Sequence, residues 1–294
     1  DSDNILIYML LMLEKAKEMH LPVRRENFQK YGESVELFKG VKEWFKLIND
    51  YGEKHGVIVE HYINSSGMKE IIEGTSIANE FKTIFACAYY YDENGDALWP
   101  AAAVNYTNKT QYLFKINKGI FSIRDSVKIN ESVPEEDKRV KFTNMIYFGD
   151  GETDVPCMKL IKQLGGTAVA VYEPGNSKKK DIALTLLKQQ RVNYVCEADY
   201  SKGKNLNLLI EGIIDKIKAD EHLLKIFERL YHEEGEVLGT RASQSQYELV
   251  REKFPQVQYD PLSRILKIEK LDKVHEGKIA VCTAGTADIP VAEE

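Results

Sequence analysis

The stretch Asn144–Pro156, with the sequence NMIYFGDGETDVP, decides the fold class of this 294-residue chain. Its apolar beginning, Met145–Phe148, predicts a buried strand. The strand stops at the Gly-Asp-Gly turn of residues 149–151, where glycine allows a close approach of the backbone. A helical pattern starts near Pro156. A buried strand, a glycine turn and a helix in this order are typical of α/β proteins, which bind ligands at the carboxyl ends of their strands.

Two carboxylates stand at this strand end. Asp150 lies in the turn, and Asp154 follows it four residues later. Mg²⁺ prefers oxygen ligands and is commonly held by one or two carboxylates, so the pair predicts a Mg²⁺ site. Aspartate beside glycine is also ordinary turn chemistry, and a plain turn therefore stays open as the alternative for this motif alone.

Strand and helix patterns alternate on both sides of this motif. Apolar and β-branched runs predict strands at 57–63, 84–91, 145–148, 167–172 and 193–196. Helical spacing predicts helices at 3–19, 24–32, 41–51, 111–117, 157–164, 182–190 and 206–231. Residues 92–95 predict a hairpin turn. The alternation predicts an α/β fold with a doubly wound parallel sheet.

Composition indicates which kinds of binding partner and which cellular compartment to expect. A net charge of −6 argues against nucleic acid and anionic membranes as partners. The apolar stretch Ile5–Leu13 is too short to span a bilayer and lacks the basic start of a secretion signal. The four cysteines are widely separated and form no CxxC pair, which argues against a disulfide framework or a zinc site and predicts a cytoplasmic protein. Oligomeric state is not readable from these features.

Two polar sequence features lie upstream of the carboxylates. One stands at the end of a predicted strand and the other at the start of a predicted helix. Ser65, Ser66 and Gly67 end the strand predicted at 57–63, and Lys109 opens the helix predicted at 111–117. Taken alone, Ser65 could be an ordinary helix N-cap and Lys109 a surface lysine. The lysine run at 178–180 predicts a solvated helix start, with phosphate binding as the alternative.

The order of these motifs resembles the haloacid dehalogenase-like (HAD) phosphohydrolase superfamily, in its phosphoserine-phosphatase-like branch. The similarity runs through most of residues 37–200 and includes Glu60–Ile63, Tyr106–Thr110 and Asn117–Gly119. It implies a small phosphate ester as substrate and Mg²⁺ as cofactor, held by the two aspartates.

The resemblance also implies roles for the upstream residues. Ser65 would donate a hydrogen bond to a phosphate oxygen, and the backbone N–H groups of Ser66 and Gly67 would add donors. Lys109 would place a positive charge between the phosphate and a nucleophilic carboxylate. Phosphoryl transfer depends on such positioning and charge neutralisation.

The superfamily's nucleophile has no counterpart in this sequence. It is the first aspartate of an Asp-x-Asp motif that ends an apolar strand ahead of all the motifs above. Asp1-Ser2-Asp3 has the spacing, but a helical pattern follows it and no strand precedes it. We therefore expect the nucleophile upstream of residue 1. The missing strand is the central one of the family's sheet, so the strands ending near Ser65 and Asp150 should each have an unpaired edge.

The C-terminal part resembles a different family, the LarB carboxylase of nickel-pincer cofactor synthesis. The similarity is carried by Val237–Ser243, Tyr259–Arg264 and Lys278–Glu294. It implies a nicotinate nucleotide as substrate, with the carboxylase core expected beyond the final residue. A strand that feeds a glycine- and threonine-rich turn is a plausible phosphate cradle, and the candidate nucleotide loop is Gly285, Thr286 and Asp288.

Together, these patterns predict three segments: a helical cap remnant at 1–36, a HAD-like core at 37–231 and a LarB-like partial segment at 232–294. The leading functional prediction is a Mg²⁺-dependent phosphohydrolase that is incomplete as given, because its nucleophile is absent. The alternatives are a fragment of a LarB-like carboxylase and a non-catalytic module that binds a phosphorylated ligand.

Overall fold

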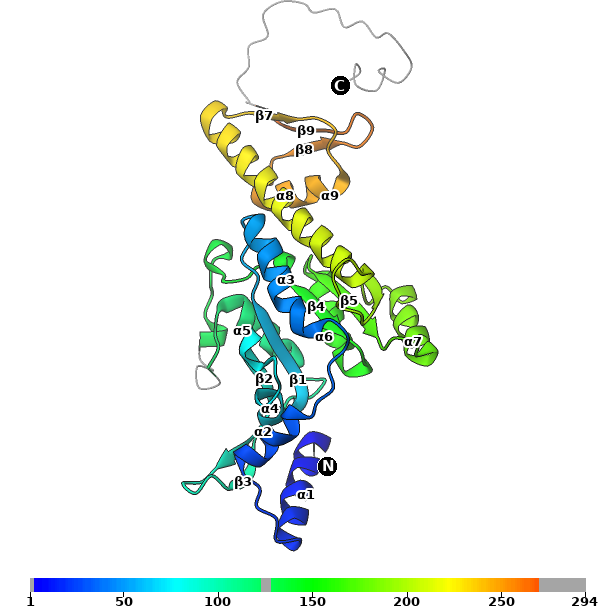
Figure 1. Cartoon of the computed structure of the whole chain (residues 1–294). Helices are drawn as coiled ribbons and strands as arrows, with labels where there is room; N and C mark the ends of the chain where they lie inside the picture. Colours follow the sequence, from blue (N-terminus) through cyan, green and yellow to red (C-terminus); the bar gives the residue numbers. More distant parts are fainter. Residues whose placement is uncertain (1–2, 123–127, 270–294) are drawn as a thin grey trace, which may run out of the picture. The chain divides into compact units, whose positions relative to one another are not determined.

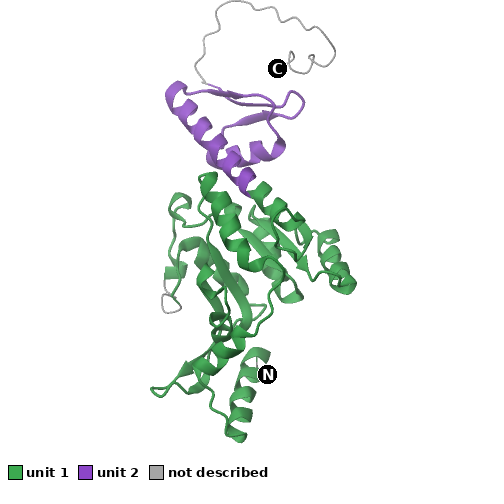
Figure 2. Cartoon of the chain, in the orientation of Figure 1, with its two compact units in different colours: residues 1–213 green, residues 214–294 purple. Residues whose placement is uncertain are grey.

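The computed structural model describes residues 3–122 and 128–269 (Figure 1). The chain divides into two compact units, residues 1–213 and residues 214–294 (Figure 2). The division falls inside the long helix α8 (Asn205–Glu234). The predicted segment boundaries at 36/37 and 231/232 remain predictions.

The first unit contains a mixed sheet in the order β1-β2-β3. Its strands are β1 (His61–Met68), β2 (Phe81–Tyr91) and β3 (Ala97–Ala102). β1 runs parallel to β2, and β3 returns antiparallel through the predicted hairpin turn. Asp92 stabilises that turn by accepting the N–H groups of Asn94 and Asp96, and Gly95 supplies a φ of +80°.

A second sheet of the same unit is entirely parallel, in the order β4-β5-β6. Its strands are β4 (Ile146–Gly149), β5 (Thr167–Tyr172) and β6 (Tyr194–Glu197), connected by α6 (Val155–Gln163) and α7 (Ser177–Lys188). The middle of β5 is fully buried, with Ala168 and Val169 at 0% exposure. This burial explains why parallel strands read as continuous apolar runs in the sequence.

The α/β class is confirmed, with parallel and mixed sheets, but the described residues do not form one continuous doubly wound sheet. β1 and β4 each have a single neighbouring strand in the described part of the chain. A missing strand between β1 and β4 stays a prediction, because the described residues show only that each is the edge strand of its own sheet.

The remaining helices of the first unit are α1 (Asn4–Glu18), α2 (Arg25–Glu33), α3 (Val41–Lys54), α4 (Lys69–Glu73) and α5 (Lys109–Lys118). Short 3₁₀ turns occupy Ala78–Glu80, Lys128–Asn130, Glu135–Asp137, Phe142–Asn144 and Glu152–Asp154. α3 contacts both sheets, because Trp44 packs edge-on against Phe148 of β4 and Phe45 packs edge-on against His61 of β1. One helix therefore covers strands of both sheets.

One strand boundary was predicted wrongly. The strand expected at 57–63 is β1, which begins at His61 and runs on to Met68. The N–H of Val57 donates to the carbonyl of Gly52 at 2.8 Å and thereby closes the end of α3. Residues 57–60 are consequently a connection, and the strand begins where pairing with β2 becomes available.

In the second unit, a small antiparallel sheet packs with helices around an apolar core. Its strands are β7 (Val237–Gly239), β8 (Gln258–Asp260) and β9 (Ile265–Ile268), in the order β7-β9-β8, and its own helix is α9 (Gln244–Lys253). A capping box of Ser243 and Gln246 starts α9. The core includes Phe227, Val250 and Leu266.

Across the described residues, no helix combines the length and the apolar character needed to cross a membrane.

Candidate functional site

A buried ion pair joins two of the residues that the sequence singled out. Lys109 is the first residue of α5, and Asp154 stands at the N-cap of α6. The ammonium of Lys109 donates to Oδ1 of Asp154 at 2.8 Å, and the two side chains are only 5% and 11% exposed. Residues 45 positions apart therefore meet near the carboxyl end of β4, as the sequence motifs implied.

A tyrosine on β4 completes this contact. The hydroxyl of Tyr147 donates to the same Oδ1 of Asp154 at 2.7 Å. Burial, and secondly the negative charge of Asp154, raise the pKa of Tyr147 far above its ordinary value. The phenol therefore keeps its proton, and one carboxylate oxygen accepts hydrogen bonds from a cation and from a neutral donor.

The close packing of Asp154 depends on Gly149, the last residue of β4. A Cβ atom at this position would lie 2.6 Å from Cβ of Asp154 and 2.2 Å from the terminal methyl group of Met158. Both distances are shorter than real carbon contacts, so a larger residue would displace the carboxylate. The glycine is required here for close approach.

Asn64 connects β1 to the same cluster. Its amide nitrogen donates to the backbone carbonyl of Lys109 at 3.0 Å and lies 3.9 Å from the sulfur of Cys157 on α6. Its amide oxygen is buried and has no hydrogen-bond partner among the described residues. Burial raises the pKa of Cys157 to about 11, which argues against a thiolate in this cluster.

The segment Ser65–Gly67 lies beside Asn64 but differs from the expectation. It belongs to an irregular end of β1, where the pairing shifts between Asn64 and Met68, and the helix that follows has only five residues. The hydroxyl of Ser65 accepts the N–H of Gly67 at 3.0 Å, so this N–H is already engaged. The hydroxyl of Ser66 is buried without a partner in the described part of the chain. The phosphate-binding roles of these three residues remain predictions.

Asp150 lies at the solvent edge of the cluster. Its side chain is 66% exposed, and one carboxylate oxygen is 4.0 Å from the ammonium of Lys179 at the start of α7. Burial raises the pKa of Tyr200 to about 12, with the nearby charge of Asp150 as the second cause. Asp150 therefore has a cation and a phenol as neighbours, and Lys179 comes from the lysine run noted in the sequence.

The two predicted Mg²⁺ ligands lie in different surroundings: Asp150 is exposed beside Lys179, whereas Asp154 is buried and paired with Lys109. Within residues 3–122 and 128–269, no three histidine, cysteine, aspartate or glutamate side chains gather into a metal cluster. Asp150 and Asp154 supply two carboxylates. Mg²⁺ commonly binds through one or two carboxylates together with water and substrate phosphate, so this donor chemistry is compatible with the predicted ion.

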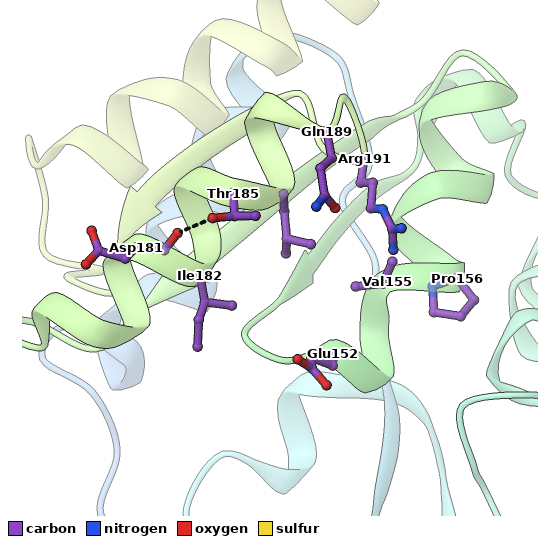
Figure 3. Close-up of a pocket in the computed structure, with 9 residues that line it drawn as sticks. Glu152, Val155, Pro156, Asp181, Ile182, Thr185, Gln189 and Arg191 are labelled. Carbon is purple, nitrogen blue, oxygen red and sulfur yellow. Dashed lines mark hydrogen bonds between the residues drawn. The ribbon is translucent and has the colours of Figure 1, made fainter.

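A groove of about 540 Å³ lies next to this cluster, between the start of α6 and α7 (Figure 3). Its apolar wall includes Val155, Pro156 and Ile182, and its charged residues are Glu152, Asp181 and Arg191. None of the predicted site residues lines it. The groove therefore neighbours the ion pair without containing it.

The candidate nucleotide loop of Gly285, Thr286 and Asp288 lies outside the described residues. Two members of the cluster, Tyr147 and Asn64, were missed by the sequence reasoning. Tyr147 was read as part of an apolar core strand, although its hydroxyl was a polar signal two residues before Gly149. Asn64 was not singled out, although an amide directly before Ser65 was a similar signal.

Two comparisons with known proteins bear on the family of this chain. Residues 211–270 match the family profile described as the LarB/PurE-like N-terminal domain, which supports the LarB-like prediction for residues 232–270. The match begins within the predicted HAD-like core and does not reach residues 278–294. No family profile of HAD phosphohydrolases matches. An uncharacterized protein of Borreliella burgdorferi is 30% identical over 203 aligned positions, a match that covers 62% of this chain and 68% of that protein. The chain belongs to the same family as this Borreliella burgdorferi protein.

Proposed function

We propose that the first unit binds a small phosphate ester together with Mg²⁺, in the manner of HAD-like phosphohydrolases. The observation that carries the proposal is the buried ion pair between Lys109 and Asp154, which lies at the end of β4. Parallel α/β sheets bind their ligands at this edge.

The charges of the cluster support this choice of ligand. Lys109 offers an ammonium to phosphate oxygens, and the hydroxyl of Ser65, two residues from Gly67, keeps a proton to donate. Asp150 and Asp154 would hold the ion. When bound, Mg²⁺ would neutralise phosphate charge and polarise the ester.

Burial of the pair argues for a role in chemistry. Removing two charges from water is expensive, and a buried salt bridge often stabilises a protein less than apolar side chains of similar volume would. A buried ion pair of this kind is therefore better explained by a ligand that uses it.

We extend the proposal to the fold. Residues 37–231 would form a HAD-like core in which β1 and β4 flank the position of the nucleophile-bearing strand. The support is that both are edge strands and each pairs in parallel with its neighbour. Hydrolysis through a phospho-enzyme needs a nucleophilic carboxylate in addition to Asp150 and Asp154, because the proposal assigns both of these to the ion.

Calorimetric titration with inorganic phosphate, with and without Mg²⁺, tests the binding proposal. We expect Mg²⁺-dependent binding that is lost in Asp154→Asn and Asp150→Asn. The matched control is Asp181→Asn, an exposed carboxylate of α7 that lies in the neighbouring groove. Binding that ignores Mg²⁺, or that survives both site substitutions, would contradict the proposal.

An assay with p-nitrophenyl phosphate then distinguishes hydrolysis from binding alone. Turnover that requires Asp154 supports the phosphohydrolase. Mg²⁺-dependent phosphate binding without turnover favours the non-catalytic phosphate-binding module.

The second unit has its own candidate function, supported by the match of residues 211–270 to the LarB/PurE-like N-terminal domain. We propose that it belongs to a LarB-like carboxylase that acts on a nicotinate nucleotide. Titration with nicotinate mononucleotide tests this, and binding should be unaffected by Lys109→Met in the first unit. Absence of binding by the whole chain would count against this second function.

A further inference from the structure

The groove beside α6 and α7 carries opposite charges at its two ends. Asp181 lies in the first half of α7, and Arg191 follows the end of the same helix. Figure 3 shows these two residues on opposite sides of the groove, with Ile182 between them. A ligand with only one sign of charge would meet one favourable and one unfavourable end. The arrangement therefore favours a ligand that carries both charges.

Both charged side chains are free to bind a ligand. Asp181 and Arg191 are exposed, and neither side chain has an ion-pair or hydrogen-bond partner in the described part of the chain. The hydroxyl of Thr185 donates to the backbone carbonyl of Asp181 at 2.8 Å and leaves its carboxylate unengaged. A guanidinium group can bind a carboxylate through two parallel hydrogen bonds, so Arg191 suits the anionic end of a ligand.

The part of the groove between the charges is apolar. Val155 and Pro156 of α6 line one side, and Ile182 and Leu186 of α7 line the other. The side chain of Ile182 is 45% exposed, so a ligand with apolar side chains would remove this surface from water.

The length of α7 sets the length of a ligand that reaches both charges. Eight residues separate Asp181 from Gln189, which lines the groove beside Arg191, and a helix rises about 12 Å over this distance. A single α-amino acid carries its ammonium and carboxylate on one carbon atom and cannot reach both ends. An extended peptide covers about 3.3–3.6 Å per residue, so about three residues are needed.

We propose that this groove binds a short apolar peptide with free ends, whose carboxylate pairs with Arg191 and whose ammonium pairs with Asp181. Its volume of about 540 Å³ is within the usual range of small-molecule sites. The inference does not rest on the phosphate site, because neither Lys109 nor Asp154 lines the groove.

NMR titration of the whole ¹⁵N-labelled chain with trileucine tests the proposal. We expect saturable shifts at the residues that line the groove. N-acetyl-trileucine lacks the ammonium and trileucine amide lacks the carboxylate, so each should bind about fivefold more weakly, the upper range for an exposed ion pair. No saturable shifts, shifts elsewhere on the chain, or equal affinities for the three peptides would overturn the proposal.

Two variants assign the ends of the peptide. Arg191→Met should weaken trileucine about fivefold and leave the affinity for the amide unchanged, because the amide has no carboxylate to lose. Asp181→Asn should weaken trileucine to the same extent and leave the affinity for the acetylated peptide unchanged. Each variant that weakens all three peptides equally, or none of them, would overturn the assigned pairing.

The matched control for charge is Lys188→Met, because Lys188 is an exposed cation of α7 that does not line the groove. It should leave all three affinities unchanged, and a loss as large as that of Arg191→Met would overturn the proposal. Asp181→Asn should also retain Mg²⁺-dependent phosphate binding, so a failure of the groove and a failure of the phosphate site are distinguishable.

Discussion

An ion pair of the first unit and an ion pair of the second unit differ in burial. The first unit encloses the ion pair of Lys109 and Asp154 within its interior, next to an apolar cluster that includes Tyr147 and Cys157. The second unit has an apolar core, and its ion pair of Lys253 with Glu228 lies at the surface, with side chains 48% and 41% exposed.

This difference separates two kinds of evidence about function. In the first unit the arrangement of side chains points to chemistry, although the relative that this chain matches is uncharacterized. In the second unit a family is matched, although its described core has the composition of an ordinary scaffold. Buried charge is costly and indicates a site, whereas apolar packing and surface pairs mainly support the fold.

The largest expected effect comes from breaking the buried pair. Lys109→Met leaves Asp154 buried without its cation and should lower the free energy of unfolding of the first unit by about 3–5 kcal/mol. Both tryptophans, Trp44 and Trp99, belong to this unit, so urea unfolding followed by tryptophan fluorescence reports it selectively. Lys109→Met/Asp154→Leu should recover much of the loss. If Lys109→Met alone were as stable as wild type, the contrast between the units would be contradicted.

A core truncation in the second unit should lower the stability of that unit, and circular dichroism should report the loss. Leu266 is 1% exposed, and Leu266→Ala should lower the free energy of unfolding of this unit by about 2–5 kcal/mol. Circular dichroism should show an early transition, while tryptophan fluorescence should keep its wild-type midpoint. Equal shifts in both signals would show that the units do not unfold separately.

A smaller effect concerns pH and the first unit. Burial lowers the pKa of His61 to about 4, from about 6.5 in an unfolded chain. As the pH falls, His61 therefore takes up a proton in the unfolded state at a higher pH than in the folded state. Above pH 6.5, His61 should not reduce the free energy of unfolding of the first unit. Between pH 6.5 and 4, that free energy should fall by at most about 3 kcal/mol.

Urea midpoints from fluorescence across this pH range test the effect. The stability difference between wild type and His61→Gln should shrink as the pH falls. His222→Gln, in the second unit, should leave the fluorescence midpoints unchanged. A constant difference between wild type and His61→Gln would contradict the assignment.

The smallest effect should come from the surface of the second unit. Lys253→Met removes the exposed ion pair with Glu228. Both side chains of this pair are already solvated. We expect no measurable change in the circular dichroism transition. A loss comparable to that of Leu266→Ala would contradict the division between surface and core charge.

Much of the architecture could be predicted from the sequence because periodicity directly reflects burial. The apolar run at Met145–Phe148 and the hairpin turn at 92–95 correspond to β4 and the β2–β3 connection. The pairing of strands was less accessible, because it depends on which edges meet in space. The irregular end of β1, which includes Ser65, likewise depends on its register with β2.

For the candidate site, the sequence predicted the charged members and missed the neutral ones. Lys109 and Asp154 were identified by motif order, and they contact each other. Tyr147 was missed because tyrosine is common in strands, although its partner Asp154 is only seven residues away. Asn64 was missed because its partner Lys109 is 45 residues away. Only the folded arrangement reveals that Tyr147 contacts the carboxylate of Asp154 and that Asn64 contacts the backbone of Lys109.

Anomalous diffraction from crystals of the chain grown with Mn²⁺, as a substitute for Mg²⁺, and phosphate tests the central claim most directly. The account predicts an ion bound by the carboxylates of Asp150 and Asp154, with a phosphate between it and the side chains of Ser65 and Lys109. An ion bound elsewhere, with the pair of Lys109 and Asp154 unchanged and no phosphate beside it, would contradict the account.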